Sequence, residues 1–297
     1  MSELALYFNH HPIALIAVAG LLGLVVGSFL NVVSYRLPLM MFREWRIQAR
    51  EYLELDPNDE SKDDNDALNL AFPASHCPNC KEDIWARDNI PLFGWIFLRG
   101  KCRHCGARIS VRYPIVECLT AIFSMVVVFY FGFNIEALAA LVLTWSLIAL
   151  SLIDIDHQIL PDQITLSLLW LGLLLSLFSF EAFSTPTEAI VGAIAGYLSL
   201  WTIYMIFKII TGKEGMGFGD FKLFAALGAW LGWQSLPLII LLSSLVGAAF
   251  GISLIVFRGA DRQLAIPFGP YLAAAGWIAL IWGENIIQAY LGTPLLH

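Results

Sequence analysis

Long apolar runs constrain this chain more than any other feature of its sequence. Hydrophobic residues make up 58% of it and charged residues 14%, and the mean hydropathy is +0.72, above the usual range of soluble domains. Strand-like alternation is nowhere sustained, which argues against a lipid-facing barrel. The sequence therefore predicts an all-α, multi-pass membrane protein with about eight transmembrane helices. The apolar runs are residues 13–33, 114–131, 136–153, 164–180, 188–210, the short 221–231, 236–257 and 267–291.

Basic residues predict how these helices are oriented. All but five of the 17 Lys and Arg lie between Ser34 and Tyr113. Eight crossings place the other five on the same side, in or beside the loops after the fifth and seventh helices. The positive-inside rule then puts the long loop in the cytoplasm and both termini in the periplasm. The five residues are Lys208, Lys213, Lys222, Arg258 and Arg262.

An acidic insert at residues 51–66 interrupts the cytoplasmic segment. Its core, "ELDPNDESKDDND", has the composition of a solvated, mobile loop, and we assign it no role. The net charge of −7 comes from this stretch and from scattered acids, so it gives no indication of a nucleic-acid partner.

Two cysteine pairs follow the insert, "CPNC" at Cys77 and Cys80 and "CRHC" at Cys102 and Cys105. In each pair the two-residue gap lets one turn present both sulfurs to one metal, and four thiolates complete a tetrahedral zinc shell. The spacing predicts a structural zinc ion in a ribbon-like insert. His76 and His104 flank the cysteines as alternative ligands, and a redox role is the competing interpretation.

A cluster of acids, "SLIDIDHQILPDQIT", ends the third apolar run. Asp154 follows apolar residues and is predicted to be buried, which makes it a functional candidate. Asp156 is explained by contact with cytoplasmic water, and Asp162 by a position in the first turn of the next helix.

A second carboxylate, Asp220, follows the glycines of "GMGFGDFKLF". An even number of crossings separates it from Asp154, so both should reach the same membrane boundary. Gly215, Gly217 and Gly219 permit unusual backbone angles and close approaches. Two carboxylates facing across a water molecule can share a proton and activate that water against a peptide carbonyl. A phosphate-binding loop is the alternative, but the Lys-Ser/Thr ending and the preceding strand are missing.

Together these motifs resemble the bacterial type IV prepilin peptidases, membrane aspartyl proteases of the GxGD class. The resemblance rests on "GFGD" and "DIDHQILPD", and on "GSFLNVVSYRLP" at 27–38, "DNIPLFGWIFLRGKCRHC" at 88–105 and "RYPIVE" at 112–117. It implies that Asp154 and Asp220 are the catalytic pair. It also implies that the four cysteines form the cytoplasmic tetracysteine site of the family.

The resemblance further implies a bifunctional enzyme of the bacterial inner membrane with its active site on the cytoplasmic side. Such enzymes remove the short basic leader of type IV prepilins or type II secretion pseudopilins, then methylate the new N-terminus with S-adenosylmethionine. Residues 1–33 would be the first transmembrane helix, 34–113 the zinc-binding loop and 114–297 a seven-helix peptidase core. No glycine fingerprint follows a strand, so no residue is assigned to the methyl donor.

Two other classes of function compete with this interpretation. A proton- or metal-coupled transporter also places carboxylates within helices, although usually near the bilayer midplane. A non-catalytic assembly factor would leave both aspartates unexplained. Glu117, one turn inside the second helix, either binds substrate or methyl donor or pairs with an Arg. The oligomeric state and the choice of pilin are not predicted.

Overall fold

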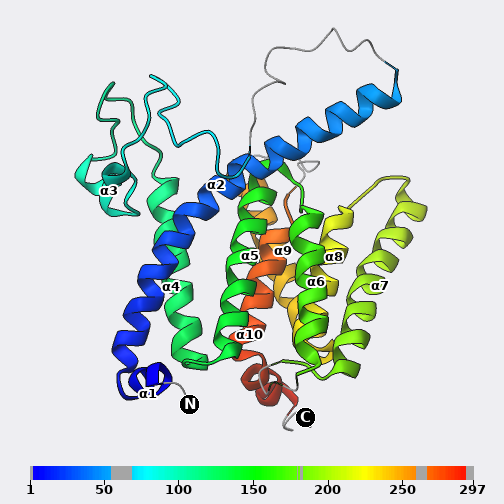
Figure 1. Ribbon diagram of the computed structural model, residues 1–297. Helices are drawn as coiled ribbons and strands as arrows, with labels where there is room; N and C mark the ends of the chain where they lie inside the picture. Colours follow the sequence, from blue (N-terminus) through cyan, green and yellow to red (C-terminus); the bar gives the residue numbers. More distant parts are fainter. Residues whose placement is uncertain (1–2, 55–68, 179, 181–182, 259–265, 292–297) are drawn as a thin grey trace. The chain divides into compact units, whose positions relative to one another are not determined.

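A computed structural model describes residues 3–54, 69–178, 180, 183–258 and 266–291 (Figure 1). Within these residues the secondary structure is helical, apart from two isolated β-bridges, His76–Asp83 and Lys101–Arg108. The predicted all-α fold is therefore confirmed. The chain forms two compact units, Met1–Phe133 and Asn134–His297.

The first unit is organised by two helices that pack side by side through glycines. A Cβ added at Gly23 would lie 2.6 Å from Ala121 Cα, and one at Gly27 would lie 2.7 Å from Glu117 Cα. Only glycine lets the two backbones approach this closely. The helices are α2 (Pro12–Tyr52) and α4 (Arg112–Phe131), accompanied by α1 (Glu3–His10), η3 (Ala86–Asn89) and α3 (Phe93–Phe97).

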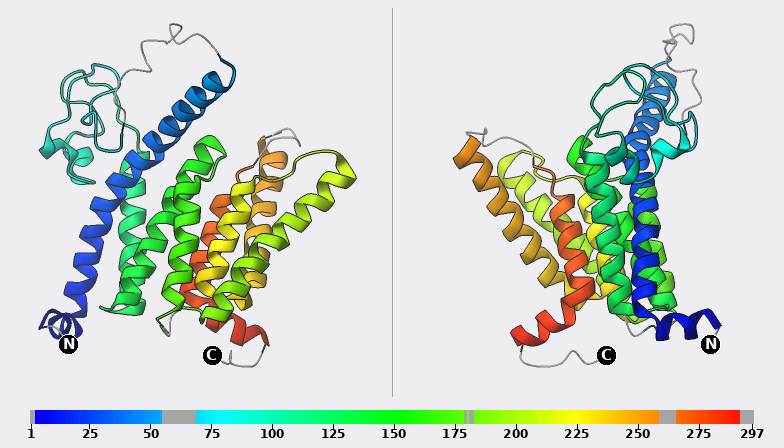
Figure 2. Two further views of the ribbon diagram at one scale, coloured as in Figure 1. Left: turned by 45° about the vertical axis from the view of Figure 1, so that its right-hand side comes forward. Right: turned by 90° about the vertical axis from the view of Figure 1, so that its left-hand side faces the viewer.

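Helix α2 is longer than the sequence predicts. The apolar run ends at Val33, but Figures 1 and 2 show one continuous helix that ends at Tyr52. The residues after Val33 include Leu, Met, Arg, Glu, Gln and Ala, all strong helix formers, and Pro38 removes only one backbone hydrogen bond. The predicted cytoplasmic segment therefore begins with a helix.

The second unit is a bundle in which a short helix, α8, packs against four others. It contacts α6, α7, α9 and α10, and its residues from Asp220 to Trp230 are buried except Lys222. A helix that is apolar on nearly every side needs such an enclosed position. The helices of this unit are α5 (Ile135–His157), α6 (Asp162–Ser176), α7 (Pro186–Thr211), α8 (Phe218–Leu231), η4 (Trp233–Ser235), α9 (Leu236–Arg258) and α10 (Gly269–Leu291).

Contacts of α8 combine backbone proximity with buried hydrogen bonds. A Cβ at Gly192 of α7 or at Gly228 of α8 would overlap the other glycine's carbonyl group, as expected of a helix-packing face. Trp230 Nε1 donates to the Leu168 carbonyl of α6 at 2.8 Å. These contacts fix α8 between its neighbours, with Asp220 in its first turn.

Helices occupy all eight apolar runs, and five spans in the described residues are long and apolar enough to cross a membrane. Helices α6 and α8 have 15 and 14 residues, which reach roughly 20 Å at 1.5 Å per residue, short of a hydrocarbon core of about 30 Å. A multi-pass membrane protein is thus supported, while the count of eight crossings stays a prediction. The spans are Pro12–Tyr52, Arg112–Phe131, Ile135–His157, Pro186–Thr211 and Trp233–Phe257.

The structure does not describe most of the acidic insert, and it groups helix α4 differently from the sequence prediction. The interpretation of the acidic insert falls mostly on residues 55–66, which lie outside the described residues, as do Lys62 and Arg262. Helix α4 belongs to the first unit because it packs on α2, whereas the sequence places 114–297 in one core.

Candidate active site and metal centre

Asp154 and Asp220 lie at the same end of the second unit. Asp154 is in the last turn of α5 and Asp220 is in the first turn of α8, with 5% and 7% of their surfaces exposed. The two carboxylates interact electrostatically. Each sequence motif supplied one of these candidate acids, and both acids are buried. This end of the bundle is therefore the candidate active site.

The hydrogen bonds of the two carboxylates differ. Asp154 Oδ2 accepts a hydrogen bond from the backbone N–H of Gly269, at the start of α10, at 2.9 Å. Asp220 Oδ1 is buried and has no hydrogen-bond partner within the described part of the chain. A buried carboxylate oxygen without a hydrogen-bond partner strongly favours a proton, a water molecule or a substrate group as partner.

Glycines at the site serve close approach rather than unusual backbone angles. Gly215, Gly217 and Gly219 all lack a positive φ, so the prediction of unusual angles is wrong. The close approach is present: a Cβ at Gly219 would lie 2.7 Å from Leu160 Cβ, and a Cβ at Gly269 would lie 2.7 Å from Asp154 Oδ2. Glycine at these two positions makes room for the turn between α5 and α6.

Gly269 is the site residue that the sequence interpretation missed. Its backbone N–H holds Asp154, although 115 positions separate the two residues. The available signal was the "FGP" triplet, in which Gly269 and Pro270 begin a helix at the end of the bundle that carries the acids. Nothing in that triplet points to a carboxylate partner.

The other acids of the first motif are in different surroundings. Asp156 is exposed, as predicted. Asp162 is also exposed and opens α6, as predicted, but it additionally forms an ion pair with Lys222 of α8, with Nζ 2.7 Å from each carboxylate oxygen. The structure thus separates one buried acid of the motif from two acids at its surface.

The four predicted cysteines of the first unit form one cluster. Their sulfur atoms all lie within 4.8 Å of one another, with Cys77 Sγ 3.8 Å from Cys105 Sγ and Cys80 Sγ 4.0 Å from Cys102 Sγ. Four thiolates around zinc at about 2.3 Å would lie about 3.8 Å apart. The cluster therefore fits a metal ion and a zinc-ribbon-like insert. His76 instead contacts the Ala74 carbonyl at 3.1 Å.

Each cysteine pair lies in a turn with the same backbone pattern. In the first turn the N–H of Lys81 donates to the Cys77 carbonyl at 2.9 Å, and in the second the N–H of Gly106 donates to the Cys102 carbonyl at 3.0 Å. Lys81 and Gly106 both have positive φ, 63° and 69°. The two turns thus present their sulfurs in equivalent ways.

Polar contacts favour the thiolate form of Cys105 and brace the second turn. The Asn79 side chain donates to Cys105 Sγ at 3.5 Å and, with the backbone N–H of Ala107, lowers the pKa of Cys105 to about 6. Arg103, between the cysteines of the second turn, makes two hydrogen bonds to Asp88 of η3, at 2.7 and 2.5 Å. This ion pair lowers the pKa of Asp88.

Glu117 of α4 is buried and holds the loop before α3. Its Oε2 accepts a hydrogen bond from the N–H of Leu92 at 2.6 Å, and Ser28 of α2 is a second partner. Leu92 has a φ of 62°, which is unfavourable for a leucine and is stabilised by this bond. The predicted pairing with an Arg is not found within the described residues.

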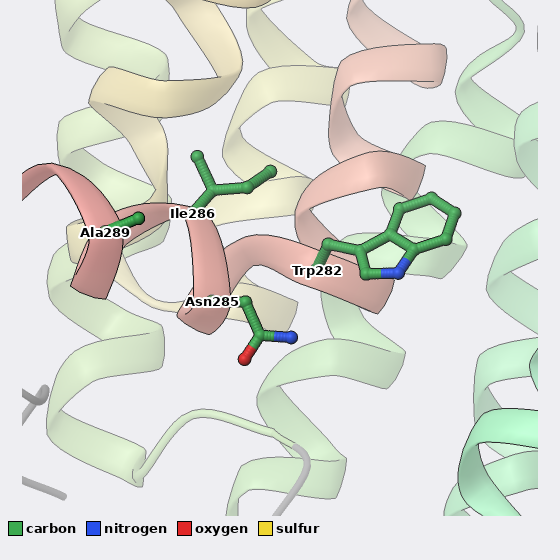
Figure 3. A pocket seen from close by; sticks show the side chains of 4 residues that line it. All are labelled: Trp282, Asn285, Ile286 and Ala289. Atoms are coloured by element: carbon green, nitrogen blue, oxygen red, sulfur yellow. The ribbon is translucent and has the colours of Figure 1, made fainter.

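A shallow groove on α10 lies well away from the acids. Figure 3 shows its lining residues, Trp282, Asn285, Ile286 and Ala289, which all come from this one helix. They begin 13 residues after Gly269, roughly 20 Å along a helix axis. The groove is therefore not part of the candidate active site.

Fold and site together define a class: multi-pass α-helical membrane proteins with a buried carboxylate pair and a tetracysteine module. Comparison with known proteins identifies the family. Residues 21–131 match the model of the bacterial peptidase A24 N-terminal domain, and residues 141–252 match the type IV leader peptidase family. This chain belongs to the type IV leader peptidase family.

Relatives match the chain along nearly its whole length. Three examples are each named prepilin leader peptidase/N-methyltransferase. The protein of Stutzerimonas stutzeri is 54% identical over 96% of both chains, that of Pseudomonas aeruginosa 53% over 96% of both, and that of Legionella pneumophila 45% over 97% of this chain and 98% of its own. No solved structure matches the chain significantly. These comparisons give no support to the transporter interpretation.

Proposed function

We propose that this protein removes the leader peptide from type IV prepilins or type II secretion pseudopilins and then N-methylates the new N-terminus. Its relatives are named for these two activities and match it from end to end. The observation that carries the peptidase assignment is the buried pair Asp154 and Asp220 at one end of the second unit.

In the proposed mechanism the two carboxylates share the activation of water. One carboxylate is protonated and orients the scissile carbonyl, while the other accepts a proton from the attacking water. The Gly269 N–H fixes Asp154 Oδ2, which leaves its second oxygen for the shared proton or the water. Asp220 Oδ1, buried and without a described partner, is the oxygen that faces the reacting groups in this mechanism.

The substrate would approach this site from the cytoplasmic boundary of the membrane. A prepilin presents a basic leader followed by an apolar helix, so its scissile bond lies where the helix leaves the bilayer. The acids occupy the ends of α5 and α8, the end toward which the positive-inside rule assigns the basic loops. We infer on this basis an inner-membrane enzyme with periplasmic termini.

The four cysteines are proposed to hold one zinc ion. Four thiols at these separations match tetrahedral coordination, so the metal ion needs no further ligand. The metal would stabilise the small module rather than take part in peptide hydrolysis, because four sulfurs leave no open position for water. Metal binding and folding of the module would then be coupled.

S-adenosylmethionine is the proposed methyl donor, since the relatives are named N-methyltransferases. When bound, it supplies the methyl group for the amine that cleavage exposes. This order of events requires the peptidase to act first, because the amine does not exist in the intact prepilin.

One assay separates the two activities. The purified protein in detergent is incubated with a prepilin and a labelled methyl donor, and cleavage and label are followed together. We expect cleavage to precede label in the wild type, and neither in Asp154→Asn or Asp220→Asn. A precleaved pilin should still be labelled by both variants. Complete cleavage without label would restrict the function to that of a peptidase.

A further inference from the structure

An ion pair between Asp162 and Lys222 joins the first turn of α6 to the N-terminal part of α8. Lys222 Nζ lies 2.7 Å from both carboxylate oxygens of Asp162, so the contact is bidentate. The side chains are 53% and 27% exposed, and ion pairs this exposed contribute little to stability. The position of the pair gives it a different importance: Asp220 lies two residues before Lys222, and Asp154 lies in the last turn of the helix that precedes α6.

The turn between α5 and α6 connects the helix end that carries Asp154 to the helix start at Asp162. Gln158 closes the end of α5 in the left-handed conformation, with its N–H bonded to the Asp154 carbonyl at 2.9 Å. Leu160 then packs against Gly219 of α8: an added Cβ there would be 2.7 Å from Leu160 Cβ. The turn is thus held against α8 by a tight apolar contact and by the ion pair beside it.

We propose that Asp162 and Lys222 are positioning residues for the peptidase. Their ion pair fixes the turn between α5 and α6 against the first turn of α8, and so sets the separation of Asp154 and Asp220. This inference rests on the proposed function, in which these two carboxylates activate water.

Lys222 acts through Asp162 rather than on the substrate. Residues two apart on a helix point about 200° apart around its axis, so Lys222 lies on a different side of α8 from Asp220. Its ammonium group already contacts both oxygens of Asp162. Catalysis is sensitive to such support, because misplacing reacting groups by about 1 Å can lower the rate by about 10²-fold.

The test compares steady-state cleavage of a prepilin by Asp162→Asn, Lys222→Met and Lys222→Arg, with melting temperatures measured in the same detergent. In the first two variants we expect kcat to fall about fivefold to tenfold, with KM and the melting temperature nearly unchanged. Lys222→Arg preserves the charge and should recover most of kcat. Lys213→Met, an exposed lysine in the preceding loop, is the matched control and should behave as the wild type.

A double variant, Asp162→Asn with Lys222→Met, keeps the test decisive if either single variant folds poorly. If the two residues act as one pair, the double variant should be no slower than the single variants. Unchanged kcat in the single variants would overturn the proposal. A raised KM at constant kcat would also overturn it, because Lys222 would then bind the substrate directly.

The catalytic variants distinguish an error in the positioning role from an error in the peptidase mechanism. Asp154→Asn and Asp220→Asn are measured beside the other variants. If these two are inactive while Lys222→Met is fully active, the carboxylate pair stands and the positioning role is overturned. If both Asn variants cleave normally, the proposed mechanism itself is wrong, and the positioning role falls with it.

Discussion

Each cysteine pair lies within one short turn, whereas Asp154 and Asp220 meet only because the ends of α5, α8 and α10 pack together. In the cysteine module, backbone hydrogen bonds across four residues orient each pair of sulfurs. At the acidic site, the hydrogen bond that holds Asp154 comes from a residue 115 positions away. The comparison shows that the cysteine geometry is largely local, while the carboxylate geometry depends on the whole second unit.

The largest expected effect is the loss of either carboxylate. Asp154→Asn and Asp220→Asn should each lower cleavage by about 10³-fold, because a lone carboxylate cannot serve as both acid and base. The double variant should be no worse than the single ones, since the residues act as a unit. Prepilin cleavage by correctly inserted variants provides the measurement.

The exposed acids of the same motif are the controls for this prediction. Asp156→Asn should retain most of the activity, and Asp162→Asn should remain far more active than either catalytic variant. An inactive Asp156→Asn beside an active Asp154→Asn would contradict the assignment and move the catalytic role two residues along the chain.

Removal of one cysteine should affect the cysteine module far more than the acidic site. We expect Cys102→Ser to lose the metal and unfold the cysteine module, because zinc binding supplies much of such a module's folding free energy. Peptidase activity should remain at about half or more of the wild type, as the acids are held by helix packing. The measurements are zinc content by elemental analysis, proteolysis of the 69–111 segment, and cleavage.

The wild type should contain about one zinc ion per chain in this experiment. Cys118, a cysteine of α4 outside the cluster, offers the matched control: Cys118→Ser should retain the metal. A wild-type protein without metal, with four freely titratable thiols in the folded state, would contradict the zinc assignment.

Adding one methyl group at Gly269 tests the long-range origin of the acidic site. Gly269→Ala would place a Cβ 2.7 Å from Asp154 Oδ2, so the carboxylate must shift. We expect kcat to fall about tenfold or more through this displacement. Gly283→Ala on the same helix meets its nearest neighbour at 3.7 Å and should leave kcat unchanged. Equal kcat in the two variants would contradict the role of Gly269.

The smallest effect concerns the ion pair of the cysteine module. Because Arg103 lowers the pKa of Asp88, the ionised form is favoured by folding, and this stabilisation is present above the unfolded pKa of about 3.9 and is lost as pH falls below it. Between pH 7 and pH 5 the small melting-temperature difference between wild type and Asp88→Asn should therefore stay constant. Thermal melting of the zinc-loaded protein measures it, and a difference that shrinks within this range would contradict the assignment.

Features that depend on neighbouring residues could be predicted from the sequence. Apolar runs predicted the helices, since a segment's hydropathy reports its burial whatever it packs against. The spacing within each cysteine pair predicted the metal cluster, because two residues between ligands already define a turn. The burial of Asp154 and the exposure of Asp156 could likewise be predicted from a single stretch, because an apolar run precedes Asp154.

How distant segments meet became apparent only in the folded chain. The partnership of Gly269 with Asp154 and of Lys222 with Asp162 follows from helix packing, which no local pattern encodes. The extension of α2 beyond Val33 also escaped hydropathy, because helix propensity rather than burial continues it. The glycines before Asp220 show the limit most clearly: the sequence required residues without side chains there, but whether they supply backbone freedom or room for Leu160 depends on what packs against them.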